Sequence, residues 1–335
     1  MWQVRPLDCG DLAAVECLLQ TTTLRLSTLP DNREKLAQSI AAARQGFAGK
    51  DKLATLLFGL QDGDGILQGI CGIQPHAGAD EPFYSYRIDE LVHASRHLGI
   101  NQRQTVLYLS HELTGLTSLC SFVLAPALRA TPLFHLLSRS RLLYMAAHRH
   151  AFADELICEI QGIWDDQGQS LFWKHVGELF FGMDFITADQ HCALHGKTAI
   201  AELLPAYPVY NTLLPEDVQT VIANHHPATQ RTIDWLQAEG MHKTRFVDPF
   251  DAGPTYRGKL EHMASIQAIR PFDSISKHQS TTEHSSSWLV SQGEGANFVC
   301  MILSGHLQDG VFHCAQSAML NDGTPGLLLS LEMTQ

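Results

Sequence analysis

Runs of apolar residues separated by polar turns predict short strands and helices along this chain. Leu119 to Leu124 has the length and composition of a buried strand, and Pro126 ends it. Thr131 is the expected N-cap of a following helix, with Pro132 in the first turn, where its missing N–H costs nothing. A strand, a turn and a capped helix in this order can offer backbone N–H groups to a phosphate. The alternative is a buried strand–helix pair without a ligand.

The helix after this turn is expected to extend to about residue 149. Leu133, Leu136 and Leu137 recur at helical spacing, so one of its sides should face the core. Arg139, Arg141 and Arg149, with His148, are expected to put positive charge on and around it.

The N-terminal part of the chain alternates strands and helices. The pattern predicts a strand over 3–5, then a helix that begins at Pro6 and Asp8 and carries Leu12, Val15 and Leu19 on one face. A second helix is expected over 33–47, followed by two strands over 53–60 and 66–74. Asp62-Gly63-Asp64-Gly65 between the last two is a strong hairpin signal. Further strands are expected over 84–94, 106–109 and 156–163. Together these elements indicate an α+β fold, with a mixed sheet wrapped by helices.

The C-terminal part predicts fewer and shorter elements. Helices are expected from 171 to about Gly177, over 215–223 and over 228–239, and strands over 296–303, 311–315 and 326–331. The segments 171–185 and 232–248 share a pattern: a helix, a glycine, and an extended run with an aspartate at or near its end. This weak internal repeat suggests two related halves. The predicted divisions are 1–195, a smaller second half at 196–272, a polar linker at 273–287 and a β extension at 288–335.

Composition and charge exclude several classes of protein. Hydrophobic residues make up 45% of the 335 residues and charged residues 17%, which is typical of a globular protein with a full core. The net charge of −12 argues against nucleic acid and anionic membranes as partners. We find no signal-peptide pattern and no apolar run near the ~20 residues that span a bilayer. The eight cysteines are scattered without a C-x-x-C pair, so we expect reduced thiols in a cytoplasm.

Two groups of histidine and cysteine were considered as metal ligands. The first is His191, Cys192 and His195, and the second is Cys300, His306, His313 and Cys314. Neither group has the paired short spacings of a structural zinc site, so we expect no metal.

Several separate stretches of this sequence resemble the arginine N-succinyltransferase family. They occur in order over residues 3–270 and read RPLDCGDL, EPFYSYRIDELVHASRHLGI, SHELTG, LCSF, SRSRLLYMA, FWKHVGELFFGMDF, IAELLPAYPVY, HHP and DPFDAGPT. The stretches EPFYSYR and HASRHLGI are most similar to the alpha-type subunits of bacteria that carry two paralogous chains. The last sixty residues match poorly.

The resemblance implies a GNAT-type N-acyltransferase fold with a second, GNAT-like half and a particular reaction. The reaction is transfer of a succinyl group from succinyl-CoA, used as a co-substrate, to the α-amino group of L-arginine in arginine catabolism. Ornithine is implied as a second acceptor of the two-subunit forms. The thioester of CoA is expected beside the strand at 119–124, and its pyrophosphate on the turn that follows. We expect a homo-oligomer, or a heteromer with a beta-type paralogous subunit, and no permanently bound cofactor.

One departure from the family pattern lies in that turn. Single-chain members carry Arg-x-x-Gly-x-Gly there, whereas this chain has Arg129-Ala130-Thr131-Pro132-Leu133-Phe134. Glycine allows close approach of the backbone to phosphate, and proline removes a donor. Weaker CoA binding, or a site completed by a partner chain, would follow. The alternative function is therefore a non-catalytic partner subunit of a heteromeric succinyltransferase.

The resemblance also assigns the site residues. His226 matches the family's His-Pro motif, where the histidine is regarded as the proton donor, and its neighbour His225 is the less favoured choice. The alternative is that His226 only caps the helix that follows. Phe122 matches a position of succinyl-CoA contact through its backbone amide, although phenylalanine is also a natural core residue.

The charge of an arginine substrate indicates where its pocket should lie. A guanidinium pairs with carboxylates in bidentate geometry, and the candidates are Asp248, Asp251 and Glu202. The alternative for the two aspartates is ordinary turn chemistry. DAGPT stands here in place of the more usual DGGPT, which could alter the turn. Arg87 and Arg96 are candidates for the succinyl carboxylate.

Overall fold

The computed structural model describes residues 1–21, 29, 32–79, 81–195, 203–205, 207–276, 286–314 and 320–332. The chain forms two compact units, each assembled from separate segments. Unit 1 comprises 1–75, 119–153 and 260–335, and unit 2 comprises 76–118 and 154–259. These boundaries differ from the predicted divisions at 195 and 272, because the chain enters and leaves each unit more than once. The interpretation of the sequence as two GNAT-like halves stays a prediction.

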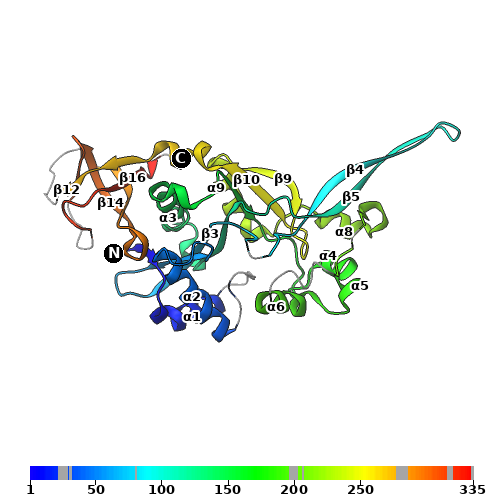
Figure 1. Cartoon of the computed structure of the whole chain (residues 1–335), viewed down its shortest axis with the longest axis horizontal. Helices are drawn as coiled ribbons and strands as arrows, with labels where there is room; N and C mark the ends of the chain where they lie inside the picture. The colour runs from blue at the N-terminus through cyan, green and yellow to red at the C-terminus, as the bar shows by residue number, and fades with distance from the viewer. Residues whose placement is uncertain are drawn as a thin grey trace. The chain divides into compact units, whose positions relative to one another are not determined.

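Unit 1 is a mostly antiparallel sheet with helices on both faces. Its neighbouring strands run in the order β11, β16, β13, β14, β1, β2, β3, β6, and β15 pairs with β14 and β12. Figure 1 shows α3 on one face of the β1–β3 part and α1 and α2 on the other. The strands are β1 (Gln3–Pro6), β2 (Leu56–Gln61), β3 (Leu67–Gln74), β6 (Thr117–Leu124), β11 (Arg270–Phe272), β12 (Ser274–Ser276), β13 (Ser286–Gln292), β14 (Val299–Gln308), β15 (Val311–Cys314) and β16 (Gly326–Ser330). The helices are α1 (Leu12–Gln20), α2 (Arg33–Phe47), α3 (Leu133–Ala147) and α10 (Ala264–Ala268).

Unit 2 is built on a second stretch of sheet. Strand β6 contributes its first two residues here, where Thr117 and Ser118 pair in parallel with β7. The order then continues β7, β10, β9, β4, β5, β8, with antiparallel neighbours. The strands are β4 (Ser85–Ser95), β5 (Ile100–Ser110), β7 (Glu155–Glu159), β8 (Val209–Tyr210), β9 (His242–Val247) and β10 (Pro254–Lys259). The helices are α4 (Leu171–His175), α5 (Gly177–Phe181), α6 (Phe185–His195), α8 (Glu216–Val221) and α9 (Gln230–Ala238).

Locally encoded elements are confirmed. Helix α2 has the predicted bounds, and its N-cap Asn32 accepts a hydrogen bond from Lys35 N. The β2–β3 hairpin closes at Asp62, whose backbone N–H donates to Ile66 O and whose side chain accepts from Asp64 N. The predicted α+β class with a mixed, mostly antiparallel sheet is therefore present.

Helix α3, which follows the turn after β6, differs from its prediction in two respects. Helix α3 begins at Leu133, one residue later than expected, because Thr131 closes the preceding turn by donating from its N–H and its hydroxyl to Leu128 O. Pro132 thus occupies the N-cap position. The helix is also buried on nearly all sides, including Arg139 and Arg141, so these two arginines do not form an exposed positive surface.

Other predicted elements were wrong in length or type. Strand β7 ends at Glu159 rather than 163, and β5 begins at Ile100 rather than 106. The segment after Gly177 forms α5 and not an extended run, so the proposed repeat does not hold there. Of the predicted polar linker, residues 277–285 lie outside the described residues, while 274–276 form β12 and 286–287 begin β13.

In the described part of the chain, no helix is both long and apolar enough to cross a membrane. All eight cysteines lie among the described residues, and none of them forms a disulfide there.

Candidate functional site

The loop that carries His226 is fixed by backbone hydrogen bonds. It lies between α8 and a 3-10 turn, Pro227–Thr229, that leads into α9. The backbone N–H of His226 donates to Gln161 O, at 2.9 Å. The Nδ1 atom of the same residue accepts from Ala228 N, at 3.2 Å, so His226 is the N-cap of the 3-10 turn. The capping role considered from the sequence is therefore real.

This cap also determines the tautomer of the half-buried His226 ring. An Nδ1 atom that accepts a hydrogen bond has no proton, so the neutral ring carries its proton on Nε2. Burial and the nearby His225 lower the pKa of His226 below its ordinary value, which favours the neutral ring. His225 itself is directed elsewhere, since its Nε2 atom lies 2.9 Å from Gln230 Oε1. His226 Nε2 is thus the ring atom that is left to act on a ligand.

Trp164 supports the His226 ring from the side. The two rings meet edge to face, with centroids 5.8 Å apart, and Trp164 also meets Phe185 edge to face. No pattern in the sequence singles out Trp164, which is an isolated tryptophan before a polar turn. Its role becomes visible only when the loops are assembled.

Asp248 and Asp251 organise the loop between β9 and β10. Asp248 Oδ1 accepts from the backbone N–H groups of Phe250 and Asp251. The two oxygens of Asp251 each accept from a backbone N–H, Oδ2 from Gly162 and Oδ1 from Gly253, both at 2.8 Å. Asp251 is only 7% exposed, so in this structure its carboxyl group serves the backbone, which is the turn chemistry considered as the alternative. That Asp251 binds the guanidinium group of the arginine substrate stays a prediction.

A single peptide unit connects the Asp251 carboxyl to the His226 loop. The peptide between Gln161 and Gly162 accepts from His226 N through its carbonyl and donates to Asp251 Oδ2 through its N–H. Burial, together with the charge of Asp248, raises the pKa of Asp251 to about 8, against the opposing effect of the two N–H donors. We infer that Asp251 positions the segment on which His226 rests.

The glycines around Asp251 are required by close backbone packing. A Cβ atom on Gly253 would overlap Ile160 O, and one on Gly162 would overlap Asp251 O. Ala252, between Asp251 and Gly253, has a φ of 56°, a left-handed conformation that strongly favours glycine. The alanine that replaces the family's usual glycine therefore keeps the left-handed conformation, at the cost of strain.

Substituting Ala252 by glycine is expected to stabilise the protein. Removing the left-handed strain contributes roughly 1–2 kcal/mol, and losing the buried methyl group costs about 0.8 kcal/mol. We expect a net gain of about 0.2–1.2 kcal/mol in the free energy of unfolding, measured by urea denaturation. A loss of stability would show that the strain at Ala252 is relieved by its surroundings.

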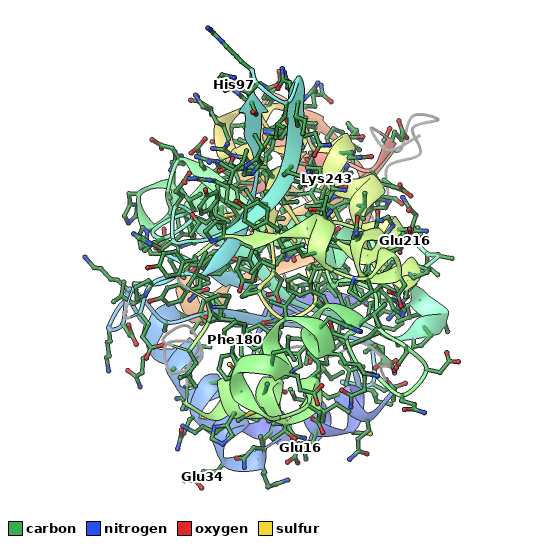
Figure 2. The ribbon with its side chains drawn as sticks, turned by 90° about the vertical axis from the view of Figure 1, so that its right-hand side faces the viewer. Glu16, Glu34, His97, Phe180, Glu216 and Lys243 are labelled. Carbon is green, nitrogen blue, oxygen red and sulfur yellow. The ribbon has the colours of Figure 1, made fainter. Side chains whose placement is uncertain are left out.

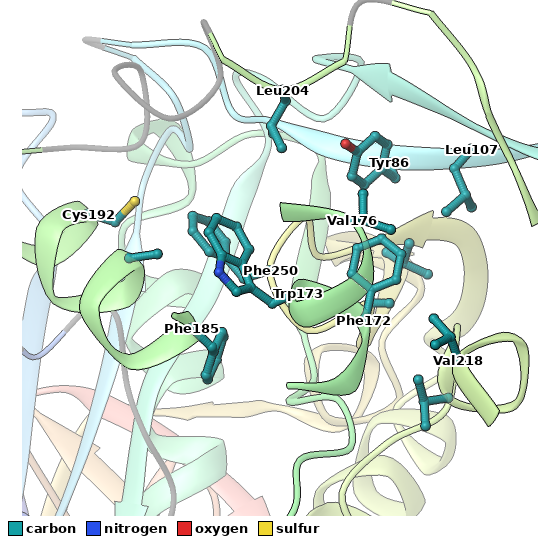
Figure 3. Close-up of a cluster of buried hydrophobic side chains, with 14 residues drawn as sticks. Tyr86, Leu107, Phe172, Trp173, Val176, Phe185, Cys192, Leu204, Val218 and Phe250 are labelled. Carbon is teal, nitrogen blue, oxygen red and sulfur yellow. The ribbon is translucent and has the colours of Figure 1, made fainter. Parts of the chain in front are cut away.

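A hydrophobic cluster holds these loops in place. Phe250, from the Asp251 loop, stacks on Trp173 of α4 with centroids 5.1 Å apart and planes 11° apart. Figure 3 shows the two rings side by side, near Phe185 and Cys192 of α6. Ser170 joins the loop to α4, because its hydroxyl donates to Phe250 O and accepts from Trp173 N. The stretch FWKHVGELFFGMDF thus supplies packing beneath the candidate site.

Phe122 lies in unit 1, directly after a strained residue of β6. Ser121 has a φ of 54°, and its side chain approaches Gly72 of β3 so closely that a Cβ there would lie 3.1 Å from Ser121 Oγ. The Phe122 ring is partly buried between Phe134, at 5.4 Å, and the guanidinium of Arg141, at 5.3 Å from the ring centroid. Both packing and ligand contact are compatible with this setting, so its CoA role stays a prediction.

The turn after β6 uses its own backbone donors. The N–H groups of Leu128, Arg129 and Thr131 donate to carbonyls within the turn. The first two donors of α3 are also used, because Leu133 N donates to Thr131 Oγ1 and Phe134 N to Thr131 O. Prolines 126 and 132 have no N–H to give. Apart from those of Ala127 and Ala130, the backbone N–H groups of residues 127–134 therefore already have acceptors within the chain.

The other predicted site residues are not brought together. Glu202 lies outside the described residues. Arg87 is held in ion pairs with Asp89 and Glu112, and Arg96 is exposed at the turn between β4 and β5. Phe122 and His226 belong to different units, so their common cleft stays a prediction. Among the residues that the structure describes, no three His, Cys, Asp or Glu side chains are grouped as metal ligands.

Comparisons with known proteins point to one family. The model described as "Arginine N-succinyltransferase beta subunit" matches residues 2–265. Subunit alpha of arginine N-succinyltransferase from Pseudomonas aeruginosa is 39% identical over 274 residues, which is 81% of each chain. Subunit beta of the same organism is 38% identical over 265 residues, which is 78% of each chain. Sequence identity therefore does not separate the two subunit types.

A solved structure extends the similarity to nearly the whole chain. It is that of arginine/ornithine succinyltransferase subunit AI from Pseudomonas aeruginosa, with a TM-score of 0.87, 33% identity and 98% of both chains covered. The superposition and the mixed, mostly antiparallel sheet confirm the predicted α+β class, and the GNAT-type assignment stays a prediction. The C-terminal strands beyond residue 265, where the family model ends, are part of the shared structure.

Proposed function

Because this chain belongs to the arginine N-succinyltransferase family, it is an acyltransferase, and we propose that succinyl-CoA is its donor and L-arginine its acceptor. Ornithine is proposed as a second acceptor, in keeping with the name of the superposed subunit. We further propose that the chain is of the alpha type, works in the cytoplasm and joins a beta-type paralogous subunit. The alpha assignment rests on the stretches EPFYSYR and HASRHLGI, and the alpha and beta relatives in one organism support the heteromer. Eight cysteines without a disulfide are compatible with a cytoplasm.

The proposed reaction moves one acyl group and one proton. The neutral α-amine of arginine attacks the thioester carbonyl carbon, a C–N bond forms and the C–S bond breaks. The nitrogen loses one proton and the departing sulfur gains one, so the products are N-succinylarginine and CoA. The only chemistry required of the protein is positioning, hydrogen bonding and help with that proton.

His226 is the proposed catalytic residue, and its fixed tautomer is the observation that carries the proposal. With Nδ1 accepting from Ala228, the neutral ring offers an Nε2–H group to the charge that develops on the thioester oxygen or the leaving sulfur. The Asp251–Gly162 and Gln161–His226 hydrogen bonds fix the backbone of the His226 loop. Asp248, Asp251 and Glu202 remain proposed ligands of the guanidinium, and Phe122 of succinyl-CoA.

The function is tested by following thiol release. Purified full-length chain, given succinyl-CoA, should release CoA thiol with arginine and with ornithine, and more slowly with lysine. Acetyl-CoA is the matched donor control, since its acyl group lacks the free carboxylate of the succinyl group. Absence of thiol release, alone and with a beta-type subunit, would remove the catalytic proposal.

The pH dependence of the reaction tests the state of His226. We expect kcat/KM to fall on the acid side of a pKa below 6.5, because protonation puts a second N–H against that of Ala228 and removes the active form. Replacing His225 by glutamine should move this acid limb to higher pH, since His225 lowers the pKa of His226. If the His225→Gln substitution leaves the acid limb unchanged, that limb reports the titration of a group other than His226.

The engaged donors of the turn after β6 favour a second candidate function. A chain that cannot offer these N–H groups to a pyrophosphate would serve as a non-catalytic partner that stabilises a beta-type subunit. Calorimetry of the isolated chain with CoA separates the two functions. Micromolar binding would contradict the partner function, and its absence, together with activity only in the mixed complex, would support it.

A further inference from the structure

Tyr86 carries a buried hydroxyl group that has no hydrogen-bond partner within the described part of the chain. The residue is 0% exposed, and its oxygen neither donates to nor accepts from any described group. A buried hydroxyl without a partner costs free energy, so buried polar groups are nearly always hydrogen-bonded. Tyr256 shows the ordinary case, because it is also buried and its hydroxyl is hydrogen-bonded to the side chain of Gln237. The exception at Tyr86 therefore points to a partner from outside the chain.

The fold places Tyr86 beside the loop that carries two of the proposed guanidinium ligands. Tyr86 is the second residue of β4 and pairs with Val247 of β9. Figure 2 shows the far end of the β4–β5 hairpin at His97, so Tyr86 lies at the opposite, buried end of β4. Asp248, the next residue after Val247, begins the loop that continues to Asp251. The backbone of Tyr86 is thus one ladder position from Asp248.

The side chain of Tyr86 packs in the hydrophobic cluster that also holds the Asp251 loop. The cluster includes Ala252, the residue after Asp251. It also includes Leu204, which lies two positions after Glu202 in the sequence. Figure 3 shows the hydroxyl of Tyr86 directed toward the side of the cluster on which Leu204 lies. The hydroxyl thus belongs to the part of unit 2 in which the acceptor pocket is proposed.

The surroundings of the hydroxyl keep it neutral and able to accept a hydrogen bond. The side chains that Figure 3 labels around it, Leu107, Val176 and Leu204, have no polar atom. Burial among apolar groups raises the pKa of Tyr86 above its ordinary value, so the phenol keeps its proton at neutral pH. The oxygen of a neutral phenol can accept from an N–H group.

We propose that Tyr86 is a specificity-determining residue, and that its hydroxyl oxygen accepts a hydrogen bond from the side-chain nitrogen of the bound acceptor amino acid. The inference rests on the proposed function and adds a residue to its acceptor site. A side-chain cation brings several N–H donors, whereas both oxygens of Asp251 already accept from backbone N–H groups. Tyr86 supplies an acceptor that no described group uses. Its hydroxyl is covered in this structure, so the substrate has to displace an apolar neighbour to reach it.

The stability of Tyr86→Phe tests whether the hydroxyl lacks a partner in the protein alone. Removing an unsatisfied buried hydroxyl should raise the thermal midpoint of unfolding. Tyr256→Phe is the matched control, since it removes the hydrogen bond to Gln237 and should lower the midpoint. A lower midpoint for Tyr86→Phe would show that a buried water or another group already satisfies the hydroxyl, and would overturn the inference.

Thiol release with two acceptors tests the contact with the side-chain nitrogen. Norvaline is the matched acceptor, because it has the carbon chain of ornithine but ends in a methyl group. We expect Tyr86→Phe to raise the KM for arginine by ~10-fold and to leave kcat/KM for norvaline unchanged, since norvaline has no donor to lose. Tyr256→Phe should leave both values unchanged. Equal losses for the two acceptors, or an unchanged KM for arginine, would overturn the inference.

Stabilisation by the substrate separates this inference from the proposed function, because it requires no turnover. With CoA present, arginine should raise the thermal midpoint of wild type more than that of Tyr86→Phe, while norvaline should shift both equally. Equal arginine shifts in the two proteins, including no shift at all, would overturn the inference. A larger arginine shift in wild type without thiol release would contradict the catalytic proposal and still support the contact with Tyr86.

Discussion

Replacing His226 by asparagine is expected to lower kcat by at least ~10²-fold without destabilising the protein. An asparagine Oδ1 can accept the hydrogen bond from Ala228 N that Nδ1 now accepts, since asparagine is a preferred N-cap residue. It cannot reproduce the Nε2–H group of the imidazole. Thiol release from succinyl-CoA measures kcat, and the thermal midpoint of unfolding measures whether the cap is kept.

Two further variants separate the catalytic role of His226 from its capping role. His226→Ala removes the cap as well, so it should lose the same activity and in addition about 1 kcal/mol of stability. His225→Gln changes the neighbouring imidazole, which points to Gln230, and should keep kcat near the wild-type value at neutral pH. If His226→Asn retains full activity, His226 has only the capping role.

Replacing Asp251 by alanine is expected to lower the free energy of unfolding by about 2–5 kcal/mol. The substitution leaves the N–H groups of Gly162 and Gly253 without their acceptors, and each unsatisfied buried donor costs roughly 1–3 kcal/mol. Urea denaturation gives the free energy. Asp166→Ala, in an exposed turn, is the control and should stay within about 0.5 kcal/mol of wild type.

The pH dependence of this contribution has a definite sign. The pKa of Asp251 rises on folding from 3.8 to about 8, so between these values the folded chain binds more protons than the unfolded chain. The contribution of this group to stability is therefore greatest below pH 4 and is lost as the pH rises through 8. Asp248→Asn keeps the hydrogen bond to Phe250 N but removes the charge that raises the pKa of Asp251. Its stability relative to wild type should increase from about pH 4 to 8, and a constant difference would contradict the coupling.

The kcat of the Asp251→Ala variant tests whether Asp251 positions His226. The peptide group between Gln161 and Gly162 is hydrogen-bonded both to the Asp251 side chain and to the backbone of His226. The Asp251→Ala variant should therefore also have a lower kcat under conditions where it remains folded. A variant that is less stable but equally active would show that the His226 loop holds its position without Asp251.

Local physical rules explain what the sequence alone determined. The bounds of α2, the strand β1 and the hairpin at Asp62 depend on residues a few positions apart: a cap three residues away, an Asp-Gly turn, apolar runs of strand length. The family resemblance added the acyltransferase class and the fold, because many matching stretches in the same order are far more specific than any single motif. The sequence therefore determined the class of protein, and the family resemblance indicated His226 as the candidate for catalysis, although the tautomer of its ring was not visible there.

Only the tertiary structure decided the states of the candidate residues. The acceptor role of Asp251 depends on Gly162, 89 positions away in sequence, and the tautomer of His226 depends on a loop geometry that no residue pattern encodes. Arg139 and Arg141 were expected to put positive charge on and around α3, but both are buried, since α3 is covered on nearly all sides by elements from distant parts of the chain. The physical reason is the same in each case: burial and hydrogen bonding between segments far apart in sequence set the charge and the available atoms of a side chain, and such contacts exist only after folding.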